Sequence, residues 1–151
     1  MSRKVLLSIG FAGALALAMA APGARADDLD QASKLTFSHA VELPQHVVLP
    51  AGTYWFVRPD GIKTPDLIQV YNADRSRVVA MMLTIPVDRR DSTEHTQLKL
   101  GEQAKNQPLA LMQWYYPDRL SGHEFLYSPR QAGELAESAH ITVNAKTAPQ
   151  G

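Results

Sequence analysis

From residue 34 onward, apolar and polar side chains alternate along most of the chain, which is the pattern of β-strands with one buried face. Segments rich in proline, glycine and small polar residues separate these stretches, and such residues favour turns. The alternation predicts strands over residues 35–43, 52–57, 67–72, 78–87, 95–100, 109–116 and 124–127, with a last edge strand over 140–145. Of the sandwich and small-barrel folds that this spacing allows, we expect an all-β fold, mainly an antiparallel β-sandwich of about seven strands.

Two of the predicted strands have patterns with further consequences. In the strand over 35–43, His39 falls on the same face as the apolar residues Leu35, Phe37, Val41 and Leu43. The strand over 78–87 (VVAMMLTIPV) is apolar on both faces. We therefore expect this second strand to lie at the centre of the sheet with both of its faces covered.

The pattern changes near the C-terminus, where one short helix is predicted over residues 129–138. Ser128 is followed by Pro129 and Gln131, which is the order of an N-cap, a first helical residue and a capping-box partner. The apolar residues Ala132 and Leu135 then fall on one side of the helix.

The first 26 residues have the three parts of a secretory signal peptide. Arg3 and Lys4 precede an uncharged run over residues 5–20, and the sequence Ala-Arg-Ala ends at Ala26. We expect cleavage after Ala26 and export by the general secretion route, to the periplasm or the outside of the cell. The run is short for a membrane-spanning helix, and no second long apolar stretch follows, so no stable membrane insertion is expected after cleavage.

The remainder of the chain is predicted to be one domain with short flexible ends. Residues 27–34 form an acidic and polar lead-in, residues 35–145 the β-sandwich domain, and residues 146–151 a flexible tail.

Charge and cysteine content exclude several classes of function. The 151 residues include 15 Lys and Arg and 15 Asp and Glu. Because the first 26 residues hold three basic and no acidic groups, the remaining 125 carry 12 basic and 15 acidic groups, a net charge of −3. No cationic surplus exists for nucleic-acid binding. The absence of cysteine excludes disulfides, thiolate metal sites and cysteine nucleophiles.

Four strings of residues resemble an uncharacterised family of short secreted bacterial β-rich proteins. They are LPAGTY (49–54), IQVYNAD (68–74), WYYPD (114–118) and GHEFLYSPRQAGELA (122–136). The resemblance implies a secreted, β-rich, single-domain protein. It implies no activity and carries no catalytic residue over to this chain.

Exposed aromatic residues are the first candidate for a binding site. Because Tyr54, Trp55 and Phe56 are consecutive, Trp55 faces outward if its two neighbours face the core. Together with Trp114 and Tyr116 it could form an aromatic patch for a protein or carbohydrate ligand. The alternative, which we favour, is that both faces of the sheet are covered and these rings are core residues.

We expect a non-enzymatic binding, interaction or envelope-associated module without a cofactor, and two alternatives stay open. One is a metal-dependent or carboxylate-based hydrolase using His39, His123 or Glu124, although the five histidines have no metal-ligand spacing. The charged loop over residues 88–94 could also carry acid–base chemistry, but its balanced charges indicate a solvated loop. The other alternative is an edge-strand partner, which requires a long, uncharged, proline-free edge.

Overall fold

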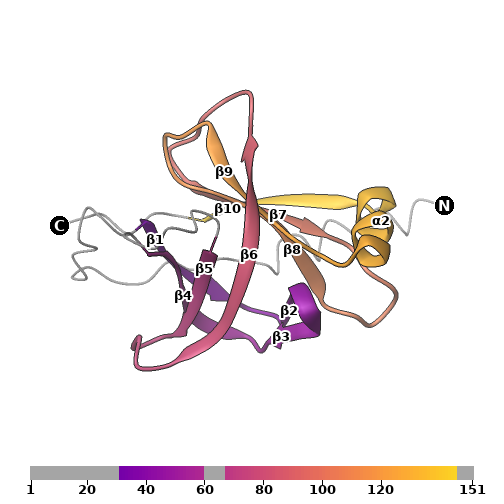
Figure 1. Ribbon diagram of the computed structural model, residues 1–151, viewed down its shortest axis with the longest axis horizontal. Helices are drawn as coiled ribbons and strands as arrows, with labels where there is room; N and C mark the ends of the chain where they lie inside the picture. The colour runs from indigo at the N-terminus through magenta and orange to yellow at the C-terminus, as the bar shows by residue number, and fades with distance from the viewer. Residues whose placement is uncertain (1–30, 60–66, 146–151) are drawn as a thin grey trace.

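The computed structural model describes residues 31–59 and 67–145, which form ten β-strands and one α-helix (Figure 1). In chain order they are β1 (Gln31–Phe37), β2 (Val41–Leu43), β3 (Val47–Leu49), β4 (Gly52–Arg58), β5 (Leu67–Asn72), β6 (Val78–Asp88), β7 (Thr96–Gly101), β8 (Leu109–Tyr115), β9 (Ser121–Phe125), α2 (Pro129–Glu137) and β10 (His140–Ala145). A single 3-10 turn, Pro44–His46, joins β2 to β3. The predicted all-β fold with one short helix is confirmed, with ten described strands instead of about seven.

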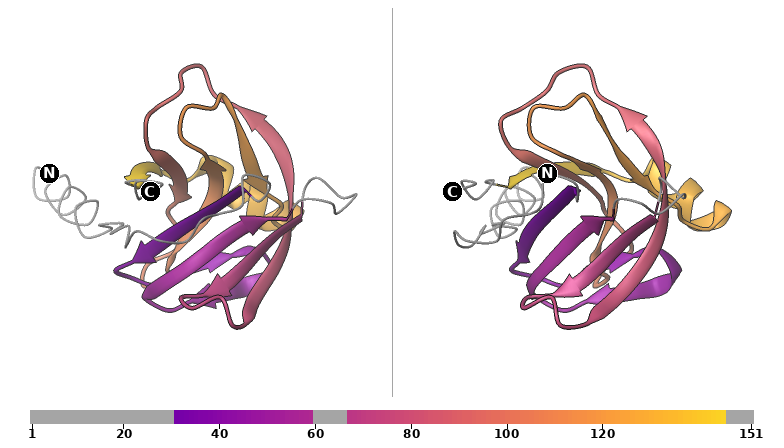
Figure 2. Two further views of the ribbon diagram at one scale, coloured as in Figure 1. Left: turned by 90° about the vertical axis from the view of Figure 1, so that its left-hand side faces the viewer. Right: turned by 60° about the vertical axis from the view of Figure 1, so that its left-hand side comes forward.

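The strands follow one hydrogen-bonded path in the order β1-β4-β5-β6-β9-β8-β2-β3, with β7 added to β8 and β10 added to β7. Every pairing is antiparallel except that of β2 with β8. Strand β6 is the longest and changes partner along its length: its first part pairs with β5 and residues 84–88 pair with β9. It therefore joins the layer of β1, β4 and β5 to the layer of β7, β8 and β9 (Figure 2).

The core lies between these two layers and is rich in aromatic rings. The ring of Phe56 on β4 lies 5.9 Å from that of Trp114 on β8 and 6.4 Å from that of Phe125 on β9, both edge-on. Edge-to-face contacts of this kind stabilise aromatic pairs beyond the area they bury. The layers are thus held together by rings from strands far apart in the sequence, and the chain has no disulfide to assist them.

The predicted strand over 35–43 is two strands in the structure. β1 begins at Gln31, inside the predicted lead-in, and ends at Phe37. The chain then bends at Ser38 and His39 before β2, which pairs with β3 and β8 instead of β4. The early start has a pairing cause, because all seven residues of β1 lie opposite the seven residues of β4. The polar residues at its start gain ladder hydrogen bonds that their own pattern does not signal.

Strand β9 also begins earlier than the predicted strand over 124–127. It starts at Ser121, so Gly122 lies inside a strand and not in a connection. A Cβ atom at this position would meet the side chain of Tyr115 and the backbone oxygen of Trp114. Glycine is therefore required by the close approach of β9 to β8, since no other residue fits without movement.

The helix α2 begins as predicted, with the Ser128 side chain accepting a hydrogen bond from the Gln131 backbone N–H at 3.4 Å. The Gln131 side chain does not complete a capping box. Its Nε2 donates instead to Oε1 of the buried Glu42 on β2, at 2.6 Å. Glu42 Oε2 accepts a second bond, at 3.1 Å, from Gln103 Nε2. The bond from Gln131 ties the helix to β2, which pairs with β8.

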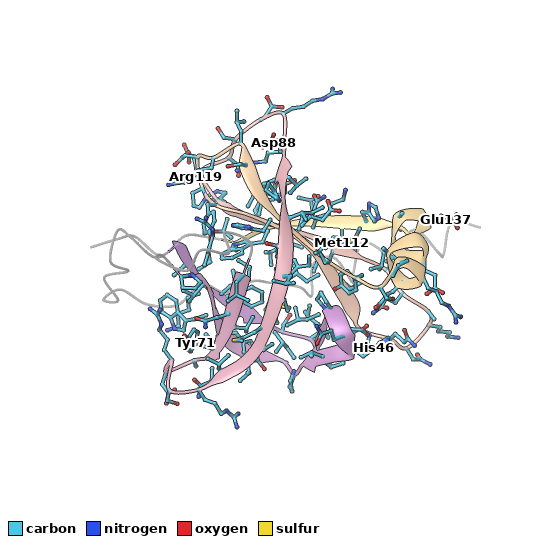
Figure 3. All side chains as sticks on the ribbon, viewed as in Figure 1. His46, Tyr71, Asp88, Met112, Arg119 and Glu137 are labelled. Carbon is cyan, nitrogen blue, oxygen red and sulfur yellow. The ribbon has the colours of Figure 1, made fainter. Side chains whose placement is uncertain are left out.

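The helix α2 also packs against the β7–β8 layer. A Cβ atom at Gly101 on β7 would meet the side chains of Met112 and Leu135, so the helix approaches the sheet closely there. Leu135 is buried, and Figure 3 shows Met112 on β8 beside the helix. The helix α2 thus covers the outer face of the β7–β8 layer.

Several predictions concern residues outside the described ranges. These are the signal peptide over 1–26 with its cleavage site, the first residues of the lead-in, and the tail over 146–151. They stay predictions.

Candidate interaction surface

The structure separates the three aromatic residues of the predicted patch. Trp114 is fully buried and Tyr116 is 7 % exposed, and both belong to the core. Trp55 lies on the outer face of β4, as expected from the inward direction of Phe56. The aromatic patch of Trp55, Trp114 and Tyr116 is therefore wrong, because β8 turns its tryptophan toward the opposite layer.

A cluster of rings surrounds His123 in the core. The His123 ring lies 5.5 Å from that of Trp114 and 5.8 Å from that of Tyr116, and its Nδ1 is 3.3 Å from Thr84 Oγ1. Burial raises the pKa of the Tyr116 hydroxyl well above its usual range, although Arg58 and Arg119 oppose the shift. His123 is thus a packed and hydrogen-bonded core residue.

The three residues of the metal or hydrolase alternative do not converge. His39 is exposed in the bend after β1. His123 and Glu124 are neighbours on β9, so His123 points into the core while Glu124 points outward, where it accepts a hydrogen bond from Gln113 Nε2 at 2.9 Å. Across the described residues, no group of three His, Asp or Glu side chains could hold a metal ion.

The charged loop after β6 is only partly solvated. Arg89 folds back toward β8 and donates to the backbone oxygens of Arg119 and Tyr116, at 3.0 and 2.9 Å. Its guanidinium carbon lies 4.9 Å from the centroid of the Tyr115 ring. Burial raises the pKa of Tyr115, and the charge of Arg89 opposes this. The expected solvated loop is confirmed for most of its residues, which are exposed, whereas Arg89 is half-buried and joins two loops.

Beside Arg89, the two loops form an open depression. Its walls come from Asp88, Arg119, Leu120 and Ser121, where the end of β6 lies beside the start of β9, and Figure 3 shows Asp88 and Arg119 at this end of the molecule. Leu120 is 52 % exposed, so the depression is in contact with solvent along its rim. It contains no convergent set of buried polar groups of the kind that an enzyme site requires.

The outer face of β6 is exposed to solvent, although it was expected to be covered. Its inward residues Met82 and Thr84 are buried at 3 % and 1 % exposure, whereas the outward Met81, Leu83 and Ile85 are 54 %, 53 % and 44 % exposed. The strand is central in the sheet, but the prediction that both of its faces are covered is wrong. In contrast to the β7–β8 layer, no described helix lies over it.

Neighbouring strands extend this apolar surface. Leu67 on β5 lies opposite Leu83, and on the other side the backbone N–H of Leu126 donates to the Leu83 oxygen at 3.2 Å. A row of three leucines therefore runs from β5 across β6 to the residue that follows β9, and Leu126 is itself 43 % exposed. We name Leu67, Met81, Leu83, Ile85 and Leu126 together the β6 surface.

Polar groups border the β6 surface. Gln69 lies opposite Met81, and Glu124 lies opposite Ile85. The Gln69 amide contacts the Met81 sulfur at 3.8 Å and accepts a hydrogen bond from the Tyr71 hydroxyl at 2.9 Å. The surface is thus an apolar strip with hydrogen-bonding groups on two sides.

Trp55 lies beyond this border, where its own chain covers it. The Lys34 ammonium is 5.5 Å and the Arg75 guanidinium 5.0 Å from the indole centroid, within the range of a cation–π interaction. Trp55 Nε1 donates to the Ala73 backbone oxygen at 3.1 Å. Arg75 also lies 5.8 Å from the Tyr71 ring. Residues of the turn over 72–77 thus lie against the indole. The Trp55 ring is therefore a poor stacking platform for a sugar.

The sequence shows the apolar residues of β6 but predicts that they are covered. A strand that is apolar on both faces indicates two covered faces, and only the fold decides whether the second cover belongs to the same chain.

Comparison with protein families, with curated proteins and with solved structures found no match. Among the described residues, no helix is long and apolar enough to cross a membrane.

Proposed function

We propose that the protein is an exported, non-enzymatic interaction module that binds a partner protein through the β6 surface. The observation that carries the proposal is the exposure of Met81, Leu83 and Ile85 on a central strand. Exposed apolar patches with polar borders are typical of sites where another protein binds. Association would remove these side chains from water, and this is the main favourable contribution to most protein–protein interfaces.

The chemistry of the β6 surface favours a protein over a carbohydrate ligand. A carbohydrate site on a sheet needs an open aromatic ring for stacking beside its hydrogen-bonding groups, and the Trp55 indole already has Lys34 and Arg75 near it. The β6 surface instead offers aliphatic side chains and a methionine, which is enriched at protein interfaces and adapts to irregular neighbours. We therefore expect a partner with aliphatic or aromatic side chains at its centre and hydrogen-bonding groups facing Gln69 and Glu124.

Export is part of the same proposal and depends on the sequence of residues 1–26. A basic start, an uncharged run and a small-residue cleavage site ending at Ala26 support it. The lack of cysteine suits a chain that folds in an oxidising compartment, because no mispaired disulfide can form. The module would then act in the periplasm or outside the cell, in association with the envelope.

A photo-crosslinking amino acid at position 83 tests the proposal in the cell that produces the protein. Position 134 on α2 provides the matched control, because Glu134 is exposed on the opposite layer. We expect one discrete cross-linked protein from position 83, no such product from position 134, and loss of the product when Met81→Lys is added.

Met81→Lys is suitable because an exposed side chain can be replaced with a change of only about 0.5 kcal/mol in stability. Circular dichroism and thermal unfolding of this variant check that the fold is retained. The same products from both positions, or a product that survives Met81→Lys, would contradict the proposal.

A further inference from the structure

Among the described strands, three lie at an edge of the sheet, and they differ in how they are protected. β1 carries Lys34, and β3 is only three residues long and is followed by Pro50. Charged residues, short length and proline are the usual means by which an edge avoids pairing with another chain. Strand β10 has six residues, HITVNA, with no lysine, arginine, carboxylate or proline. It matches the long, uncharged, proline-free edge required of an edge-strand partner.

Among the described strands, β10 pairs only with β7, so its other edge is available. The register of this pair also shows which backbone groups point away. The Glu102 N–H donates to the Ala139 oxygen at 2.9 Å, and the same register continues without a shift to Ala145 opposite Thr96. Alternate residues of an antiparallel strand direct both backbone groups to the same side. The odd-numbered residues therefore bond to β7, and His140, Thr142 and Asn144 direct their N–H and C=O groups outward.

We propose that β10 pairs antiparallel with β10 of a second copy of this chain, about a twofold axis at Thr142. In this register Thr142 lies opposite Thr142 of the partner subunit, and His140 lies opposite the partner's Asn144. These are the residues whose backbone groups point outward, so about six new hydrogen bonds form between the two strands.

The side chains are complementary in the same register. Because the pairing keeps odd residues opposite odd residues, Ile141 lies opposite the partner's Val143 on the inner face. Both side chains are half-buried and pack at the margin of the core, so the pairing would cover their remaining apolar area. On the outer face, opposed threonines are a favourable cross-strand pair, and no like charges meet. A strand that is complementary to itself is what a twofold interface requires.

The absence of cysteine provides a clean test of the register. In the Thr142→Cys variant, the two thiols lie opposite each other with Cα atoms about 5.5 Å apart, a separation that a disulfide can bridge. In the control variant Asn144→Cys, the new side chain lies on the same strand and face, but the two Cα atoms are about 15 Å apart, because they are four residues apart along the strands as well as one strand spacing across. We expect rapid disulfide-linked dimer formation for Thr142→Cys on mild oxidation, and at least tenfold slower formation for Asn144→Cys.

Sedimentation equilibrium of the cysteine-free protein provides the second measurement. We expect reversible dimer formation with rising concentration, and Thr142→Pro to abolish it while circular dichroism is unchanged. Proline removes an outward N–H and leaves the β7–β10 bonds in place. A monomer at all concentrations, or equal cross-linking of the two cysteine variants, would overturn the proposal. The β6 surface takes no part, so this result and a failure of the proposed function are separate.

Discussion

The close contact of β9 with β8 at Gly122 determines whether alanine at this position raises or lowers the free energy of unfolding. Replacing Gly122 by alanine restricts the unfolded chain, and this effect alone would stabilise the fold by about 0.5–1 kcal/mol. The new Cβ atom, however, would lie 2.5 Å from the Trp114 backbone oxygen and against the Tyr115 ring. A backbone atom cannot rotate away, so the strands must separate or the ring must move.

Overpacking of this kind costs about 1–3 kcal/mol, which exceeds the gain. After the gain is subtracted, we expect Gly122→Ala to lower the free energy of unfolding by about 0.5–2 kcal/mol, measured by urea denaturation with circular dichroism detection and linear extrapolation. The corresponding fall in melting temperature is roughly 4 °C per kcal/mol for a domain of this size.

Gly133 in α2 is the matched control. No atom lies within 4 Å of a Cβ built there, so alanine meets no obstacle in the helix. Gly133→Ala should raise the free energy of unfolding by about 0.5–1 kcal/mol through helix propensity. The two alanine variants should therefore differ by about 1–3 kcal/mol with opposite signs. If Gly122→Ala is as stable as the unmodified protein, the close approach of β9 to β8 is not present in solution.

Two further predictions concern the core and the helix. Trp114→Ala should lower the free energy of unfolding by about 3–5 kcal/mol, because the ring is fully buried, whereas Trp55→Ala at the surface should cost about 1 kcal/mol; similar losses in urea denaturation would refute the assignment of the two rings. Glu42→Ala should cost about 1–3 kcal/mol because the amides of Gln131 and Gln103 lose their acceptor. Amide hydrogen exchange should then be faster in α2, and unchanged protection there would contradict the role of Glu42 as its anchor.

Local patterns predicted the strands well where one face is buried. The strands at Leu67–Asn72 and His140–Ala145 have the predicted bounds, and the helix begins at Pro129 as its cap indicates. In each case the information lies in neighbouring residues: an alternation of period two, or a serine and a proline at the start of a helix. Such signals do not depend on where the rest of the chain is.

The positions that failed depend on distant partners. Gln31 belongs to a strand because Arg58 lies opposite it, and Gly122 lies in a strand because β8 passes close to it. Trp114 and Tyr116 could not be assigned to core or surface from their own segment, since alternation defines two faces without naming the inner one.

The sequence alone determined the all-β class, the helix, the lack of disulfides and the apolar character of both faces of β6. Only the tertiary structure decided which faces are covered. α2 packs over the β7–β8 layer because Glu42 accepts a hydrogen bond from it and Gly101 leaves room for its close approach. No described element packs in the same way over Leu83. The physical reason is that burial is a property of contacts between segments far apart in the chain. The pattern along one strand shows only which side chains are suited to burial.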